Sequence, residues 1–157
     1  MALKLTLNWK EGMQFSAIAD QHEVAMDAKA PIGRGTAQNP KQLVIAGLVG
    51  CTGMDLMAFM RKKRQEVRSF EVHAEVETIE ATKTYPAVFR SAHLTFRLTG
   101  DVDPRLALEG VSLSQTLHCG VSAMLSKAFP ISYEVFVNEV SVGRGEASFA
   151  HPSSGIS

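Results

Sequence analysis

The sequence has only two cysteines and no net excess of either charge. Cys51 and Cys119 lie far apart in the chain, and neither has a second cysteine or a histidine at metal-ligand spacing, so the pattern does not predict a zinc site. Sixteen Lys and Arg residues balance sixteen Asp and Glu residues. Because nucleic acids and anionic membranes select basic surfaces, this balance argues against either as the main partner.

The N-terminus lacks the continuous apolar segment of a secretion signal. Residues 1–9 alternate between apolar and polar side chains, so we expect a cytoplasmic protein. In that reducing compartment the two cysteines are not expected to form a static disulfide, and any role beyond packing is as thiols. A length of 157 residues suits a single domain. We place it at residues 1–145, with a flexible C-terminal tail over residues 146–157.

The longest apolar stretch predicts a central helix over residues 39–63. Asn39 can cap its N-terminus, Pro40 suits the first helical position, and the basic residues 61–64 complement the helix dipole at the other end. Asp55 is the only formal charge in the apolar part of this segment. We therefore expect the helix to be a core element, buried nearly all round.

Three glycines give this helix a surface without side chains. Gly47, Gly50 and Gly53 recur every third residue, which costs helix propensity but lets another backbone approach closely. We predict a tight helix–helix crossing at this surface. The glycines and Asp55 also argue against a membrane span, although the length would suffice for one.

Alternating side chains predict strands on both sides of the central helix. Three short strands precede it and two long ones follow, at residues 3–9, 13–19, 22–26, 69–79 and 88–98. A second helix then runs from Asp103 and Pro104 to near His118, followed by a short helix over residues 121–128 and one last strand over 131–142. Because helices do not alternate with strands, this order predicts an α+β fold with antiparallel sheets.

The two cysteines occupy different local environments. Cys51 lies mid-helix, one turn from Asp55, whose carboxylate disfavours a neighbouring thiolate, so an inert packing role stays open. Cys119 precedes a short helix whose unpaired N–H groups favour a thiolate. Arg34, in a loop of glycine and small polar residues, is a candidate for holding an anion or polarising an oxygen beside Cys51, although many loop arginines are only solvated.

Two motifs and the order of the elements carry a family resemblance. The first is the Asn-Pro segment that starts at Asn39 and leads to Gly50-Cys51, and the second is the later segment Cys119-Gly-Val-Ser-Ala-Met-Leu. With the two long strands, they resemble the OsmC/Ohr family of hydroperoxide-reducing proteins over residues 3–142. Asp55, which follows Gly-Cys-Thr-Gly-Met, also resembles the YhfA-like branch of that family.

The resemblance implies an OsmC-like fold in an intertwined homodimer, with the buried central helices crossing and the active sites at the subunit interface. It further implies that Cys51 attacks the O–O bond of an organic hydroperoxide and becomes a sulfenic acid. Cys119 then condenses with it to a disulfide, which a dithiol reductant reopens. Arg34 matches the family's stabilising arginine in role and approximate location. This mechanism needs neither a metal nor a bound organic cofactor.

Position 41 departs from the family pattern. The hydroperoxidase branches carry a glutamate two positions after the asparagine, where it pairs with the arginine, whereas this chain has Lys41. A lysine would repel Arg34. Two interpretations stay open: Lys41 marks a lost peroxidase activity, or a carboxylate from elsewhere substitutes for the glutamate, with Glu11, Glu23 and Asp27 as the candidates.

A second interpretation keeps the fold without catalysis. In it, a non-catalytic dimer binds a small lipophilic molecule in the apolar pocket around the helix crossing. Met54, Met57 and Met60 are candidates for its lining, although a Met-rich helix is commonly ordinary core. Thiol reactivity distinguishes the two interpretations, because a peroxidase needs a reactive Cys51 thiolate at neutral pH.

Overall fold

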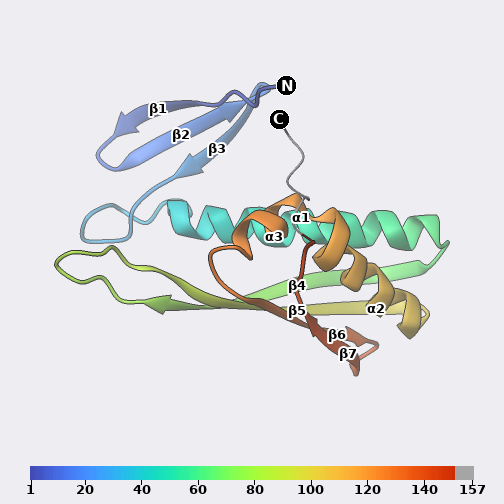
Figure 1. The fold of residues 1–157 in the computed structure, drawn as a ribbon. Helices are drawn as coiled ribbons and strands as arrows, with labels where there is room; N and C mark the ends of the chain where they lie inside the picture. Colours follow the sequence, from blue (N-terminus) through green and yellow to red (C-terminus); the bar gives the residue numbers. More distant parts are fainter. Residues whose placement is uncertain (151–157) are drawn as a thin grey trace. The chain divides into compact units, whose positions relative to one another are not determined.

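The computed structural model describes residues 1–150. The chain gathers into two compact units, Met1–Ala46 and Gly47–Ser157, and the long helix α1 (Pro40–Lys62) begins in the first and continues into the second (Figure 1). The assignment of residues 1–145 to one domain stays a prediction. Each unit is described in turn, because each has its own sheet.

The first unit is built on an antiparallel three-stranded meander. Its strands pair in the order β1-β2-β3 and are β1 (Thr6–Glu11), β2 (Gln14–Ala19) and β3 (His22–Met26). The predicted meander is therefore confirmed, with its first strand shifted a few residues toward the C-terminus. Strand β1 is exposed along its whole length, and the Trp9 side chain on it is 65% exposed. The two apolar side chains of this strand, Leu7 and Trp9, therefore lack a covering layer within their own unit.

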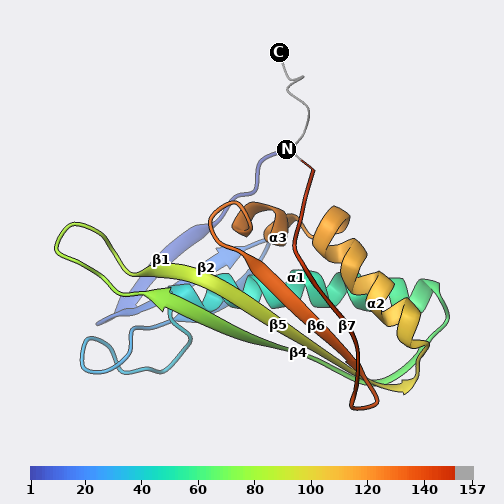
Figure 2. The same ribbon diagram turned by 60° about the horizontal axis from the view of Figure 1, so that its bottom comes forward.

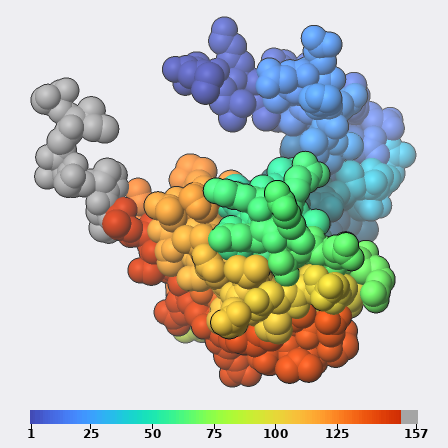
Figure 3. Space-filling model, turned by 90° about the vertical axis from the view of Figure 1, so that its right-hand side faces the viewer, coloured from blue at the N-terminus to red at the C-terminus, as the bar shows by residue number. Residues whose placement is uncertain are grey.

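Helix α1 starts and ends where the sequence predicts. The Asn39 side chain accepts a hydrogen bond from the Gln42 N–H at 2.9 Å, and the Gln42 side chain accepts one from the Asn39 N–H at 2.9 Å. This reciprocal capping box satisfies two backbone donors that the first turn would otherwise leave unpaired. Arg61 and Lys62 lie in the last turn, where Figure 3 shows the green end of the helix at the surface beside the yellow start of the next helix.

The second unit contains a four-stranded sheet in the order β4-β5-β6-β7 (Figure 2). Its strands are β4 (Glu66–Ile79), β5 (Val88–Asp101), β6 (Ile131–Val137) and β7 (Val140–Glu146). The predicted long hairpin corresponds to β4 and β5, which pair antiparallel. Its buried face includes Ala92, Leu94, Phe96 and Leu98 of β5. This face receives the helices of the unit.

Two details of this sheet differ from the sequence prediction. The single last strand expected over residues 131–142 is two strands, because Asn138 and Glu139 adopt φ values of 48° and 68° and turn the chain back. The sheet is also mixed, since β5 and β6 pair in parallel. Parallel neighbours require a crossover connection, and the helices between residues 104 and 125 supply it. Of the expected tail, Glu146 belongs to β7, and residues 151–157 lie outside the described residues.

The crossover contains three helical segments. They are α2 (Pro104–Leu113), a π-helical turn η1 (Ser114–His118) and α3 (Gly120–Leu125). Asp103 caps α2 as predicted, accepting a hydrogen bond from the Arg105 N–H at 2.9 Å. The expected helix to His118 changes to a π turn in its last part, and α3 is shorter than the predicted 121–128. Both changes affect the direction in which Cys119, the residue between η1 and α3, points.

Within one chain, α1 is buried on one face only. Its fully buried residues recur every fourth position, at Leu48, Thr52, Leu56 and Met60. A side chain added at Gly47 or Gly50 would meet nothing within 4 Å, whereas one at Gly53 would lie 3.5 Å from the ring of Phe70. The expectation of burial nearly all round is therefore wrong for a single chain. By length and hydropathy α1 qualifies as a membrane span, but its buried face packs as a core helix.

Candidate functional site

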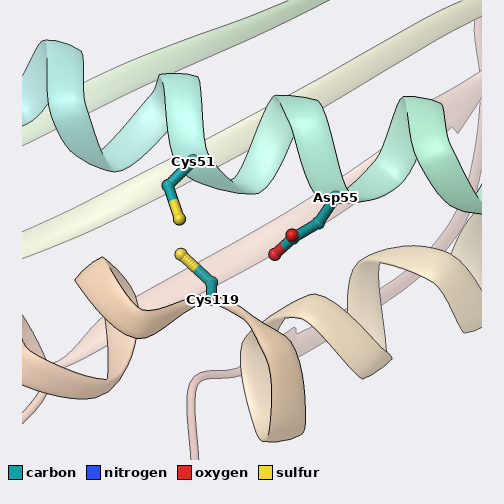
Figure 4. A group of neighbouring side chains, drawn as sticks. All are labelled: Cys51, Asp55 and Cys119. Carbon is teal, nitrogen blue, oxygen red and sulfur yellow. The ribbon is translucent and has the colours of Figure 1, made fainter. Parts of the chain in front are cut away.

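The fold of the second unit brings Cys51, Asp55 and Cys119 together. One ligand atom of each residue, the two Sγ atoms and a carboxylate oxygen, lies within 4.8 Å of the others. Figure 4 shows both sulfurs pointing toward each other and the Asp55 carboxylate directed to the same space. Cys51 is half-buried and Cys119 is fully buried. Two of the three residues predicted for the site thus meet, and the third group at this place is Asp55.

Local structure explains how each of these side chains is aimed. Cys51 and Asp55 are four residues apart on α1, so they share one face of the helix. Cys119 lies between η1 and α3 with an extended backbone, φ −74° and ψ 102°, and its N–H donates to the Ser114 carbonyl at 2.9 Å. A π turn inserts an extra residue into a helix and changes the direction of the chain beyond it. Here it ends α2 so that Cys119 faces α1.

Burial sets the acidity of Cys119. It raises the pKa of the Cys119 thiol, while the hydrogen bond from the Ser122 N–H acts in the opposite direction and the neighbouring Cys51 adds to the rise. The Ser122 N–H donates to the Cys119 Sγ at 3.3 Å. The sequence-based expectation that the helix start makes Cys119 a favoured thiolate is therefore wrong. Helix α3 has only six residues, and its few N–H groups do not outweigh the loss of solvent.

A buried polar network holds Asp55 in place. The Ser114 hydroxyl lies 2.8 Å from the Asp55 Oδ2 and 3.1 Å from the Thr52 Oγ1, and the Gln115 amide donates to the Thr52 Oγ1 at 2.9 Å. Thr52, Ser114 and Gln115 are completely buried. Sequence reasoning missed these residues, although a Ser-Gln pair within an apolar helix was a usable signal. The network ties α1 to η1, and so fixes the elements that carry both cysteines.

Arg34 belongs to the first unit, where it has an acidic partner. Its guanidinium group donates a hydrogen bond to the Glu11 carboxylate, and both side chains are largely exposed. Of the three carboxylates considered as substitutes for the missing family glutamate, Glu11 is the one that pairs with the arginine. Glu23 lies 3.8 Å from the Lys10 ammonium and accepts from the Ser16 hydroxyl. Asp27 has a separate structural role.

Asp27 organises the loop that carries Arg34. Its buried carboxylate accepts from the Thr36 N–H at 3.0 Å, from the Thr36 hydroxyl at 2.8 Å and from the Ala28 N–H at 2.7 Å. The bonds from Thr36 lower the pKa of Asp27 most. A Cβ at Gly33 would lie 2.3 Å from the Ala28 carbonyl oxygen, so the loop closes tightly around this carboxylate. The loop is therefore well defined within its unit.

Comparison with known proteins identifies the class. Residues 33–134 match the model of the OsmC-like protein family, and the chain belongs to this family. More particularly, it is 31% identical over 137 residues to Protein YhfA of Escherichia coli K12, an alignment that covers 85% of this chain and 98% of YhfA. The predicted resemblance to OsmC/Ohr proteins is thereby confirmed.

Solved structures give the same fold. An OsmC-like protein from Mycoplasma pneumoniae has a TM-score of 0.73 at 15% identity, covering 87% of this chain and 97% of its own. The organic hydroperoxide resistance protein OhrB of Bacillus subtilis has a TM-score of 0.61 at 20% identity, covering 86% of this chain and 98% of its own. The predicted OsmC-like α+β fold is confirmed by these neighbours.

Proposed function

We propose that the protein is a thiol-dependent peroxidase that reduces organic hydroperoxides through a Cys51 sulfenic acid and an intramolecular Cys51–Cys119 disulfide. The observation that carries the proposal is that the two sulfurs lie within 4.8 Å of each other, although the residues are far apart in sequence. Forming a bond of about 2.05 Å needs only a small approach of the two side chains. Membership of the OsmC-like family supports a redox role for this pair.

The first step uses the more accessible thiol. The Cys51 thiolate attacks the terminal oxygen of the hydroperoxide, so that an S–O bond forms and the O–O bond breaks. The organic part leaves as an alkoxide and takes up a proton to become an alcohol. Because Cys51 is half-buried and Cys119 is fully buried, we assign the attack to Cys51.

The second step forms the disulfide. The Cys119 sulfur attacks the sulfenic sulfur of Cys51, the S–S bond forms, the S–O bond breaks, and the hydroxyl leaves as water with the Cys119 proton. The Ser122 N–H, 3.3 Å from the Cys119 Sγ, stabilises the charge that develops on this sulfur. A dithiol reductant then supplies two electrons and reopens the disulfide. The cycle uses no metal and no bound organic cofactor.

Arg34 is assigned the electrostatic role in this proposal. A guanidinium group stabilises both a thiolate and the oxygen that departs from the peroxide. The pairing of Arg34 with Glu11 supports it, because a carboxylate that holds the arginine takes over the task that a glutamate at the position of Lys41 performs in the hydroperoxidase branches. The proposal requires Arg34 to reach Cys51 in the assembled protein.

We propose that the assembled protein is a homodimer in the cytoplasm. A second copy would cover apolar side chains that one chain leaves exposed, such as Trp9 at 65% and Met54 at 76%. Gly47 and Gly50 leave open space on α1, which a second helix can fill. Sedimentation equilibrium tests the dimer, and Gly50→Leu should shift it toward monomer. The free thiols suit a reducing compartment.

Thiol counting by intact mass tests the peroxidase directly. The reduced protein is treated with one equivalent of cumene hydroperoxide, with hydrogen peroxide in a parallel reaction. We expect rapid loss of both free thiols and a mass decrease of about 2 Da, the two hydrogens lost on disulfide formation. Persistence of both thiols would overturn the proposal.

A specific hollow favours a second candidate function, the non-catalytic binding of a small lipophilic molecule. Met54, Met57, Met60 and Val67 contribute to the lining of a space of about 440 Å³ at the C-terminal half of α1. Flexible methionines suit an apolar ligand of variable shape. Cys51 does not belong to this lining, so ligand binding and thiol chemistry can be tested separately.

A fluorescent fatty-acid analogue is a suitable probe for this second function. Saturable binding that Met57→Asp abolishes and Cys51→Ser leaves unchanged would assign the hollow to a ligand. If Cys51 also reacts slowly with alkylating reagents at neutral pH, binding becomes the better description of the protein. Fast alkylation of Cys51 without saturable binding of the analogue would leave the peroxidase as the function.

A further inference from the structure

We infer that, in the reduced protein, Cys51, Asp55 and Cys119 form a binding site for a thiophilic divalent cation, with Zn²⁺ as the ion that the donor set suits best. The inference uses the same cysteines as the proposed peroxidase but does not depend on peroxide chemistry. Its basis is the placement of two sulfurs and a carboxylate oxygen within 4.8 Å of one another. Sequence spacing did not reveal the site, because its ligands come from α1 and from the residue after η1.

The three donors fit the coordination of zinc. Zinc binds thiolates at about 2.3 Å and carboxylate oxygens at about 2.0–2.2 Å, so donors of a tetrahedral site lie roughly 3.5–4 Å apart. The observed separations, at most 4.8 Å, need only small side-chain rotations to reach that range. Three protein ligands leave a fourth position for water or another small ligand, as in catalytic zinc sites.

Two independent features of the surroundings can stabilise a ligating carboxylate and a ligating thiolate. The Ser114 hydroxyl donates to the Asp55 carboxylate at 2.8 Å, and ligating carboxylates are commonly held by such hydrogen bonds. The Ser122 hydroxyl is completely buried and has no hydrogen-bond partner among the described residues, yet it belongs to the residue whose N–H donates to the Cys119 sulfur. A metal-bound thiolate at Cys119 would give that hydroxyl an acceptor.

Binding is coupled to proton release and to the redox state. Each thiol loses its proton as the metal–sulfur bond forms, so uptake of one cation by the two thiols and the Asp55 carboxylate releases up to two protons to solvent. The Cys51–Cys119 disulfide has no thiolates and cannot bind. The cation and the disulfide are therefore mutually exclusive states, and bound Zn²⁺ would shield both sulfurs from oxidants.

A Co²⁺ titration tests the site without any peroxide. Reduced protein, freed of metal with a chelator and kept anaerobic, is titrated with Co²⁺, and the absorption spectrum is recorded before and after addition of Zn²⁺. We expect sulfur-to-cobalt charge-transfer bands and intense tetrahedral ligand-field bands that saturate at one ion per chain and disappear when Zn²⁺ displaces the cobalt. A spectrum of solvated, octahedral Co²⁺ alone would overturn the inference.

Variants identify the ligands. Cys51→Ser and Cys119→Ser should each weaken the charge-transfer bands. Ser114→Ala removes no ligand but takes away the hydroxyl that bonds Asp55 and Thr52, and should lower the affinity by about 10–100-fold. Asp55→Asn should lower it at least as much, with Asp101→Asn at an exposed end of β5 as the matched control. Full affinity in Asp55→Asn would overturn the three-ligand site. Circular dichroism confirms that each variant is folded.

The cobalt titration and the peroxide assay can fail independently, so the metal site and the proposed peroxidase are tested separately. A metal-free protein that reduces cumene hydroperoxide but gives no tetrahedral cobalt spectrum keeps the peroxidase and loses the metal site. A protein that gives the spectrum but retains both thiols with peroxide keeps the metal site and loses the peroxidase.

Discussion

The two units of the chain hold their candidate residues in opposite ways. In the second unit, Cys119 is completely buried and Asp55 is fixed by a network whose other members are buried as well. In the first unit, Arg34 and Glu11 form an ion pair whose side chains are 62% and 66% exposed. One unit therefore supplies a rigid pair of thiols, and the other supplies a charged group that water surrounds.

The two units therefore differ in how completely a single chain fixes their candidate residues. The thiol pair is complete within one unit, since both sulfurs and the groups that position them lie there. An exposed ion pair contributes only about 0–1 kcal/mol to stability, so the placement of Arg34 is weakly fixed until something covers it. Strand β1, which carries Glu11, also leaves Leu7 51% and Trp9 65% exposed, and the proposed dimer predicts that a second copy covers them.

The largest expected effect comes from the cysteines. Cys51→Ser should abolish turnover, because the accessible thiol is lost and the remaining thiol, Cys119, is fully buried. Cys119→Ser should permit one round of peroxide reduction and accumulate a sulfenic acid, because the resolving thiol is absent. Stopped-flow consumption of cumene hydroperoxide and trapping with dimedone measure the two outcomes. Turnover that survives in Cys51→Ser would contradict the assignment.

The next effect concerns the exposed pair of the first unit. Arg34→Ala should lower kcat/KM by about 10²-fold, as expected when a donor to a developing negative charge is lost. The melting temperature should change little, since the ion pair is exposed. Glu11→Gln should lower kcat/KM by a smaller factor, because it leaves Arg34 in place and removes only the ion pair that holds its guanidinium group.

Glu23→Gln is the matched control for this pair. Glu23 lies in the same sheet but pairs with Lys10 and Ser16. Equal losses of activity in Glu11→Gln and Glu23→Gln would show that the pairing of Arg34 with Glu11 has no special role. A loss confined to Glu11→Gln would establish Glu11 as the substitute for the family's glutamate.

The sequence predicted those features that depend on neighbouring residues. Asn39 and Asp103 were identified as helix caps because capping needs only the next two or three residues, and both make the expected bonds. The β4–β5 hairpin was predicted from alternation over two long segments. The turn at Asn138 and Glu139 was missed because neither residue is a glycine, although both adopt positive φ.

The features that the sequence did not predict depend on tertiary packing. The full burial of Cys119 results from how η1 and α3 pack, and it reverses the effect of the helix start on the pKa of the thiol. The approach of Asp55 to Cys119 joins residues of different elements. The selection of Glu11 from three possible partners of Arg34 depends on how β1 and the loop fold together. Each of these contacts joins residues distant in sequence.

The buried network should matter for stability. Ser114→Ala removes the hydroxyl that bonds the half-buried Asp55 carboxylate and the buried Thr52 hydroxyl, and we expect the loss of these hydrogen bonds to lower the free energy of unfolding by about 1–3 kcal/mol. Thr116→Val is the matched control, because the exposed Thr116 hydroxyl donates only to the Ser112 carbonyl. Urea unfolding measures both. If the two variants were equally stable, Asp55 would not rely on Ser114.

The smallest expected effect is the pH dependence of the Arg34 loop. Hydrogen bonds from Thr36 lower the pKa of Asp27 in the folded state, so the carboxylate stabilises the loop above its unfolded pKa of about 3.9 and this contribution is lost as the pH falls through the lower, folded pKa. Asp27→Asn should therefore be less protected than wild type at neutral pH, and the two should converge in acid.

Hydrogen exchange of residues 27–39 measures this convergence, with Asp20→Asn, at an exposed turn, as control. Because exchange itself slows in acid, protection factors rather than raw rates must be compared. A difference between Asp27→Asn and wild type that stays constant from neutral pH to below the lowered, folded pKa of Asp27 would show that the charge of Asp27 is irrelevant and that only its shape holds the loop. If the protection factors of the two proteins converge in acid, the charge of the buried Asp27 carboxylate holds the loop that carries the exposed Arg34.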